Sequence, residues 1–283
     1  MRIVSFNLKK IMKYKLKRKY EDNIMEFITS DGVRLEYDDI GQGEPILIMT
    51  GYAGYKEIWR SQVELLSQHY RVINLDRRNH GRSETTTKGL RMSRQGKDIA
   101  ELLEYLKIEK ISMMGNSMGA AAIWAYCSLY GDSKINKVIS VDQSPKMISD
   151  ETWPYGLLDL DWSNFPKEAE QMYHVHTTFR NIDDETYKLV KSVQGSKKFD
   201  YALNRPLLFD HAFQDWRDVI SQLNVPVLFM SGKESPFWSP NHAVASAKLC
   251  KKGKAVIVPD SGHIIMSEQQ ELFNNIMMDF LKD

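Results

Sequence analysis

The sequence predicts an α/β protein with a mostly parallel sheet flanked by helices. Short apolar runs typical of buried strands alternate with longer stretches in which apolar residues recur at helical spacing. Strands that alternate with helices favour parallel pairing, with helices on both faces of the sheet. The alternation covers residues 25–145 and 213–283 and stops between them. The chain has 283 residues, of which 42% are apolar and 27% are charged, so it can bury a large core.

Eight segments are expected as strands. Residues 25–30 and 33–39 flank the turn signal Asp31-Gly32, which indicates a hairpin. The other six are short and largely apolar, as expected for strands buried on both faces, and lie at 45–50, 70–76, 110–115, 137–142, 225–231 and 254–260.

Five segments are expected as helices of the core. Within residues 92–107, apolar side chains recur every three or four positions, as they do on the buried side of a helix. The five helices are expected at 56–69, 92–107, 118–130, 240–250 and 268–282.

Residues 146–212 interrupt the alternation. They are rich in Trp, Tyr, Phe, Asp and Lys and contain no clean strand pattern. We expect a mostly helical insert that covers the carboxyl ends of the strands, where open α/β sheets bind ligands. Two or three of its aromatic side chains are expected to line an apolar pocket, out of Trp153, Tyr155, Trp162, Phe165, Tyr173, Phe179, Phe199 and Tyr201.

The first residues form a separate basic stretch. Residues 1–20 contain eight Lys or Arg and no Asp or Glu, and lysines break every apolar run. That pattern fits neither a secretory signal nor a membrane span. We expect residues 1–24 to be a poorly ordered extension; a basic amphipathic element that touches an anionic membrane or nucleic acid is the alternative.

Charge and cysteine content limit the classes of partner and compartment. The net charge of +1 gives no overall field that would select nucleic acid. Cys127 and Cys250 have neither metal-site nor redox spacing, which fits a reducing compartment. We therefore expect a cytoplasmic protein without stable membrane insertion, whose oligomeric state the sequence leaves open.

Ser117 is the candidate nucleophile. It stands in the motif Gly-Asn-Ser-Met-Gly (115–119), between an expected strand and an expected helix. In that setting a G-x-S-x-G motif is typical of a nucleophile elbow, because the two glycines remove side chains that a sharp turn would crowd.

These features resemble the α/β-hydrolase fold superfamily, in the serine esterase-like branch whose lid is inserted after strand six. The resemblance runs from residue 25 to the end of the chain. It rests on the elbow and on three further segments: TGYAG (50–54), LDRRNHGRS (75–83) and PDSGH (259–263). It implies a core of residues 25–145 and 213–283, with residues 146–212 as a helical cap.

The resemblance identifies His263 as the catalytic base, because it stands in the PDSGH segment. An imidazole suits this role because its pKa lies near neutrality. Of the other six histidines, His80 is expected to hold its own loop together. His174 and His176 are spaced unsuitably for a metal pair on a helix, and His69, His211 and His242 are interpreted as surface or structural residues.

The resemblance also implies an oxyanion hole made by two backbone amides. One belongs to Met118, the residue after the nucleophile. The other belongs to Tyr52, in the loop after the third strand, where Thr50 replaces the histidine that is frequent in the family.

The acid of the triad is not where the family usually has it. That position, after the seventh strand, holds Ser235. Asp142, at the end of the sixth strand, is the favoured substitute, because some relatives such as haloalkane dehalogenases carry their acid there. Glu234 is the alternative, and both preserve the chain order Ser, acid, His.

The expected activity is that of a carboxylesterase on small to medium uncharged esters, through a Ser-His-Asp triad and an acyl-enzyme. No cofactor or metal is expected to be needed. A lactonase or thioesterase would use the same machinery, and a haloperoxidase-like, peracid-forming activity belongs to the same small-esterase branch. A non-catalytic signalling relative that binds a ligand or partner at the lid is the alternative from another class.

Overall fold

A computed structural model describes residues 24–158, 160–165 and 167–283. The predicted basic extension, residues 1–24, lies outside the described residues except for Ile24, which begins the first strand.

The predicted eight-stranded, mostly parallel sheet is confirmed. The strands follow the order β1-β2-β4-β3-β5-β6-β7-β8 across the sheet. The β1–β2 and β2–β4 pairs are antiparallel, and every other pair is parallel. The strands are β1 (Ile24–Ile28), β2 (Arg34–Ile40), β3 (Pro45–Met49), β4 (Arg71–Asp76), β5 (Ile111–Asn116), β6 (Ile135–Val141), β7 (Val227–Gly232) and β8 (Gly253–Val258).

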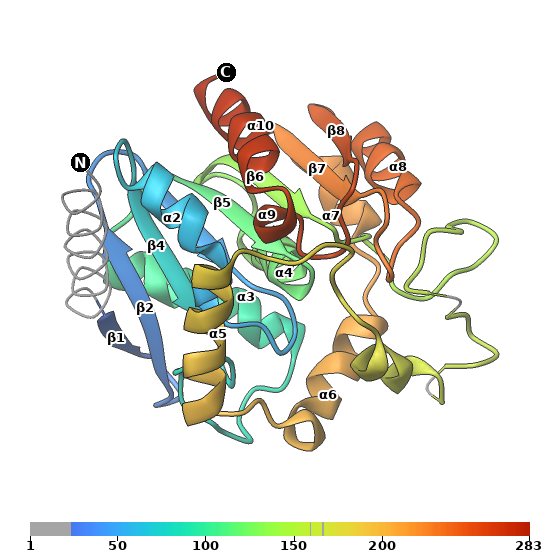
Figure 1. The fold of residues 1–283 in the computed structure, drawn as a ribbon, viewed down its shortest axis with the longest axis horizontal. Helices are drawn as coiled ribbons and strands as arrows, with labels where there is room; N and C mark the ends of the chain where they lie inside the picture. The colour runs from blue at the N-terminus through green and yellow to red at the C-terminus, as the bar shows by residue number, and fades with distance from the viewer. Residues whose placement is uncertain (1–23, 159, 166) are drawn as a thin grey trace, which may run out of the picture.

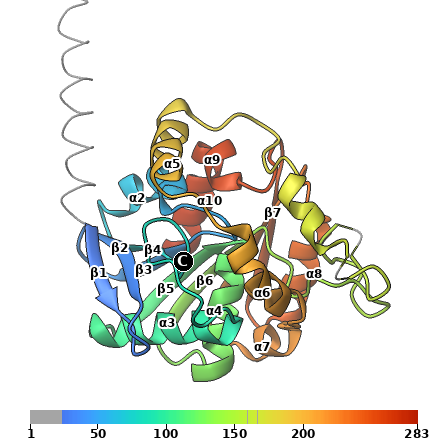
Figure 2. The ribbon, with the colours of Figure 1, turned by 90° about the horizontal axis from the view of Figure 1, so that it is seen from below.

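Helices cover both faces of the sheet, as Figures 1 and 2 show. Side chains alternate across the strands, so Leu47 and Met49 of β3 enter one apolar cluster while Ile46 and Ile48 enter the other. The first cluster is covered by α3 (Met92–Tyr105), α4 (Met118–Tyr130), α7 (Arg217–Gln222) and α8 (Asn241–Leu249). The second is covered by η1 (Lys56–Trp59), α2 (Arg60–Leu66), α9 (Ile265–Glu268) and α10 (Gln270–Lys282).

Residues 146–212, called the cap segment below, connect β6 to the core near α7. The segment contains the 3-10 helix η2 (Ala169–His174) and the helices α5 (Asp184–Ser196) and α6 (Tyr201–Ala212). The described residues between 146 and 168 form turns and isolated bridges and no helix, so the helical part is shorter than expected. Asp and Asn side chains tie up backbone amides there, as Asp161 does with Ser163 and Asn164, and such local bonds compete with a helix.

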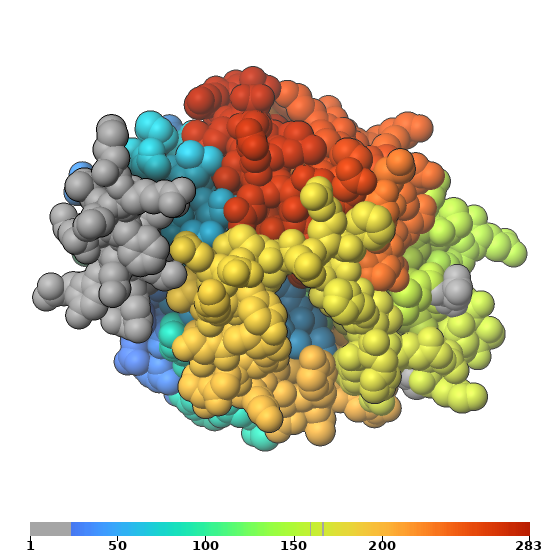
Figure 3. Space-filling model, viewed as in Figure 1, coloured from blue at the N-terminus to red at the C-terminus, as the bar shows by residue number. Residues whose placement is uncertain are grey.

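The cap segment is anchored to the core at several points. Asn204 of α6 accepts a hydrogen bond from Asn79 (2.9 Å), and Asp210 accepts one from the backbone amide of Met92 (2.7 Å). At the start of α5, Asp183 pairs with Arg60 of α2 at 2.9 Å. Figure 3 shows a hollow between the gold atoms around α5 and the yellow chain before it, with blue atoms from the first part of the chain at its floor.

Candidate active site

Ser117 occupies a strained turn between β5 and α4. Its backbone angles are φ 54° and ψ −132°, a conformation that a residue with a side chain rarely adopts. The flanking glycines allow the turn, since a Cβ at Gly119 would lie 2.6 Å from the carbonyl oxygen of Met49, and one at Gly115 would lie 2.4 Å from the amide nitrogen of Ala120. The amide of Ser117 donates to the carbonyl of Val141 (2.8 Å), which ties the turn to β6.

Asp142 follows β6 directly and contacts the ring of His263. The distance between Asp142 Oδ2 and His263 Nδ1 is 2.6 Å, and both side chains are buried. Ser235 Oγ donates to the same oxygen (2.7 Å), and the amide of Gly232 donates to Oδ1 (3.1 Å). Burial alone would raise the pKa of the Asp142 carboxyl, but the neighbouring His242 and His263 rings hold it below its usual value. Asp142 is therefore positioned to stay ionised beside the imidazole.

Glu234 is directed elsewhere. Its Oε2 accepts a hydrogen bond from the amide of Ser261 (3.0 Å), and its own amide donates to the Ser261 carbonyl (3.0 Å). Ser235, at the position where the family's acid usually stands, lies in the loop after β7, and its side chain donates to Asp142. Of the two candidate carboxylates, Asp142 is therefore the one that the structure brings to the His263 ring.

The backbone of His263 is tied to the residue before the elbow serine. Asn116, the residue before Ser117, donates from Nδ2 to the carbonyl of His263 (3.1 Å). The His263 ring meets the Phe237 ring edge-on, with centroids 4.7 Å apart, and Phe237 and Ser117 line the same cavity. With Nδ1 on a carboxylate, the neutral ring carries its proton there, which leaves Nε2 as the acceptor.

The loop after β3 packs against Ser117. A Cβ on Gly51 would lie 2.7 Å from the Ser117 Cβ. The buried guanidinium of Arg77 donates to the carbonyls of Thr50 (3.0 Å) and Gly51 (2.9 Å). In a trans peptide the amide N–H points opposite to the carbonyl, so the N–H of Tyr52 points away from Arg77. Burial lowers the pKa of Arg77 to about 9, which still leaves it charged at neutral pH.

Met118 opens α4, so its backbone amide has no acceptor within the helix. The positive end of the helix dipole lies at the same place. Both predicted amide donors thus belong to segments that adjoin Ser117.

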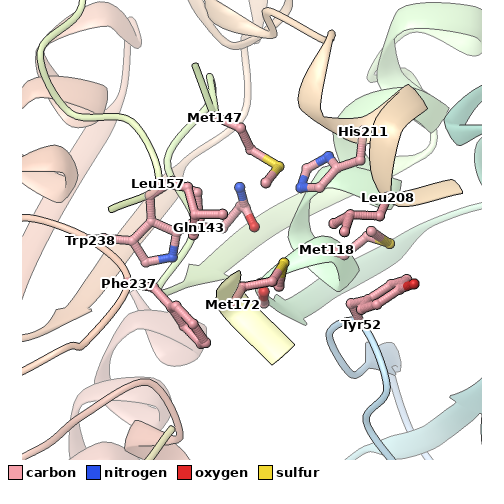
Figure 4. Close-up of a pocket in the computed structure, with 11 residues that line it drawn as sticks. Tyr52, Met118, Gln143, Met147, Leu157, Met172, Leu208, His211, Phe237 and Trp238 are labelled. Carbon is pink, nitrogen blue, oxygen red and sulfur yellow. The ribbon is translucent and has the colours of Figure 1, made fainter. Parts of the chain in front are cut away.

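A narrow cavity opens beside Ser117 under the cap segment. Its empty space, part of it open to solvent, is about 260 Å³. Figure 4 shows the side chains around it, which come from the core and the cap segment. The lining residues are Tyr52, Ser117, Met118, Gln143, Met147, Leu157, Met172, Leu208, His211, Phe237 and Trp238.

The aromatic pocket expected from the cap segment is not this cavity. None of the eight aromatic residues weighed from sequence is among the described residues that line it. Phe199 and Tyr201 instead line a second, more open pocket together with Ala53, Tyr55 and Lys191. Most of the apolar surface at Ser117 comes from methionine and leucine side chains and from the loop after β7. No helical or strand periodicity in the sequence distinguishes those residues.

Two histidines interpreted as surface or structural lie close to the site. His211 of α6 lines the cavity, and burial, with the charge of Arg77, lowers its pKa to about 3. His242 of α8 is buried, and its Nε2 lies 3.7 Å from Asp142 Oδ1, beyond hydrogen-bond length. Neither had a motif around it from which its place could be predicted.

His80 lies as expected within its own loop. Its Nδ1 is 2.8 Å from the carbonyl of Arg78, and its Nε2 is 3.1 Å from Arg77 Nη2. Within the part of the chain that the structure describes, no cluster of three or more His, Cys, Asp or Glu side chains is arranged to hold a metal ion. The described helices also include none long and apolar enough to cross a bilayer.

Comparison with known proteins gives consistent matches over most of the chain. Residues 44–165 match a family model described as alpha/beta hydrolase fold. A non-heme haloperoxidase of Rhodococcus erythropolis is 34% identical over 277 residues, which cover 91% of this chain and 100% of the relative. A bifunctional esterase/perhydrolase of Acinetobacter calcoaceticus is 26% identical over 277 residues, covering 90% of this chain and 98% of the relative. The structure of an esterase from Exiguobacterium antarcticum superposes with a TM-score of 0.81 at 19% identity, covering 92% of this chain and 99% of the other.

Proposed function

Because the chain belongs to the α/β-hydrolase fold family, we propose that it is a serine hydrolase that cleaves carboxylic esters of small to medium uncharged substrates. The observation that carries the proposal is the 2.6 Å contact between Asp142 and His263, formed beside the strained turn of Ser117. Solved relatives of the same fold include esterases, and curated relatives include an esterase/perhydrolase.

The first step is attack by Ser117 Oγ on the ester carbonyl. A serine hydroxyl is a weak nucleophile until a base accepts its proton, and His263 Nε2 is the acceptor in this scheme. The imidazolium that forms is stabilised by Asp142, whose carboxylate is held by Ser235 and Gly232. The acid stays ionised while the proton resides on His263.

The oxyanion of the tetrahedral intermediate accepts hydrogen bonds from the amides of Tyr52 and Met118. Arg77 fixes the loop that carries the first donor, and α4 supplies the second. Loss of one such donor costs about 3–4 kcal/mol in the activation barrier.

Protonation by His263 releases the alcohol and leaves the acyl group on Ser117. A water molecule, deprotonated by His263, then attacks the acyl-enzyme, and the acid is released as the serine regains its proton. The cap segment covers this chemistry as a lid.

The cavity beside Ser117 favours small acyl groups. The side chains that line it leave only a narrow space next to the serine. Its described lining residues include none that is charged at neutral pH, since burial keeps His211 neutral. A lactone or thioester of similar size would be opened by the same steps.

A second candidate activity is perhydrolysis, favoured by the similarity to two relatives, a haloperoxidase and an esterase/perhydrolase. Hydrogen peroxide would replace water in attacking the acyl-enzyme, so that a peracid and the free serine form. This route needs the same nucleophile and base.

Turnover of a 4-nitrophenyl ester series from acetate to dodecanoate tests the proposal. We expect kcat/KM to be highest for acyl chains of about two to six carbons and to fall for longer chains, because the cavity is narrow. The same assay with hydrogen peroxide and a peracid-sensitive dye measures the second activity. A folded protein that hydrolyses no ester, lactone or thioester would support the non-catalytic alternative and contradict the proposal.

A further inference from the structure

Three polar atoms in the cavity beside Ser117 have no hydrogen-bond partner. They are Gln143 Oε1, His211 Nδ1 and Trp238 Nε1. Gln143 is 1% exposed, and His211 and Trp238 are each 4% exposed. Buried polar groups are nearly always paired, so three unpaired groups around one apolar cavity need an explanation.

The orientation of the Gln143 amide is set by its neighbour. Gln143 Nε2 donates to the carbonyl of Ser144 (2.8 Å), and a carbonyl can only accept. The amide oxygen is therefore the atom left without a partner, and it is an acceptor. In Figure 4 the Gln143 amide and the His211 ring lie on either side of the end of the Met147 side chain.

The other two groups add a donor and a neutral ring. The indole of Trp238 can only donate. His211 is uncharged at neutral pH because burial lowers its pKa to about 3, so its ring offers one donor and one acceptor. An uncharged group that both donates and accepts, such as a hydroxyl, meets these requirements, whereas an ion would remain uncompensated.

The three residues are held by parts of the fold that also hold the site. Gln143 directly follows Asp142, and Trp238 follows Phe237, whose ring contacts His263. His211 lies on α6, next to Asp210, which binds the amide of Met92. The polar atoms are therefore fixed relative to Ser117 before a ligand enters, which suits selective recognition.

We propose that this cavity selects acyl groups that carry an uncharged hydroxyl, and that Gln143, His211 and Trp238 are its specificity-determining residues. The inference rests on the proposed esterase function for its turnover, although binding tests it independently. The hydroxyl donates to Gln143 Oε1 and accepts from the Trp238 indole or the His211 ring. We assign the hydroxyl to the acyl group because the narrower cavity adjoins Ser117, whereas the second pocket, near Ala53 and Tyr55, is more open to solvent.

The turnover test uses matched pairs of 4-nitrophenyl esters that differ by hydroxyl against methyl: 2-hydroxybutyrate against 2-methylbutyrate, and 3-hydroxybutyrate against 3-methylbutyrate. We expect kcat/KM to favour the hydroxylated member of at least one pair by about tenfold or more, because the analogue leaves the polar groups unpaired. Gln143→Leu should bring this ratio close to one. Gln68→Leu, which changes an exposed glutamine, is the matched control and should keep the wild-type ratio.

The binding test uses Ser117→Ala, which cannot form the acyl-enzyme, with the same intact esters in calorimetry. We expect the favoured hydroxylated ester to bind about tenfold more tightly than its methyl analogue, and this difference to disappear in Ser117→Ala/Gln143→Leu. Melting temperatures check that the variants fold. If Gln143→Leu does not fold, the ratios measured with wild type and Ser117→Ala decide by themselves.

The outcomes separate the two proposals. Preferential binding without turnover supports the hydroxyl site and contradicts the esterase function. Turnover without a preference for the hydroxylated ester supports the esterase function and overturns the hydroxyl site. An ordered water would then fill the polar positions. A preference seen only when the hydroxyl is in the alcohol, as with 2-hydroxyethyl butyrate against propyl butyrate, overturns the assignment to the acyl side. If neither a binding preference nor turnover is observed, both proposals are overturned.

Discussion

Ser117→Ala should lower kcat for 4-nitrophenyl butyrate by on the order of 10⁶-fold, to the background rate of the assay. The hydroxyl is the atom that forms the acyl-enzyme in the proposed mechanism, and alanine offers nothing in its place. Steady-state kinetics, corrected for the rate of hydrolysis without enzyme, measures the loss of kcat.

Ser140→Ala is the matched control for this substitution. Ser140 is also buried, on the neighbouring strand β6, and its hydroxyl has no hydrogen-bond partner. Activity close to wild type is expected there. Residual activity of Ser117→Ala within tenfold of wild type would show that another group performs the attack.

Asp142→Asn should lower kcat by on the order of 10³–10⁴-fold while the melting temperature stays near that of wild type. Asparagine can occupy the same space, but it cannot stabilise the imidazolium of His263 by charge. It can also present its amide to Nδ1 and so favour the wrong tautomer of the ring. The test measures kcat and the melting temperature of Asp142→Asn and of wild type, both on the same preparations.

Glu234→Gln is the matched control, because Glu234 is the other carboxylate weighed for the same role. Its side chain accepts from the amide of Ser261, whereas Asp142 is the carboxylate that contacts the His263 ring. We expect less than a tenfold change in kcat. If Glu234→Gln is instead the crippling substitution and Asp142→Asn is mild, the assignment of the acid is wrong.

The sheet and the elbow could be predicted because local sequence determines them. The apolar runs of β3 to β8 have the length and composition of buried strands, and the hairpin of β1 and β2 is marked by Asp31-Gly32. At the elbow, glycine is required wherever a Cβ would strike backbone, as at Gly115 and Gly119. Such requirements leave a visible pattern in the chain.

The acid could be narrowed to two residues but not chosen from sequence alone. Asp142 and Glu234 both follow the carboxyl ends of the neighbouring parallel strands β6 and β7, and a shift of one residue in a turn changes where a side chain points. The choice depends on the positive φ of Asp142 (48°) and on the hydrogen bonds from Ser235 and Gly232, which only the folded chain brings together.

The cavity was the least predictable part. Gln143, His211 and Trp238 come from three segments far apart in sequence, and each is unremarkable in its own surroundings. The aromatic residues of the cap segment were the more conspicuous candidates, yet several pack on one another, as Tyr201 does on Tyr173 and Phe199. Periodicity identifies core faces but not which side chains of an irregular segment face a cavity.

In the proposed mechanism, folding makes Ser117 reactive by bringing the imidazole of His263 beside it. Labelling with a fluorophosphonate, followed by mass spectrometry of the peptides, tests this most directly, because the reagent marks an activated serine and requires no knowledge of the substrate. We expect a single adduct on Ser117 that forms at least about 100-fold more slowly in His263→Ala. An adduct on another residue, or labelling of Ser117 at an unchanged rate in His263→Ala, would contradict it.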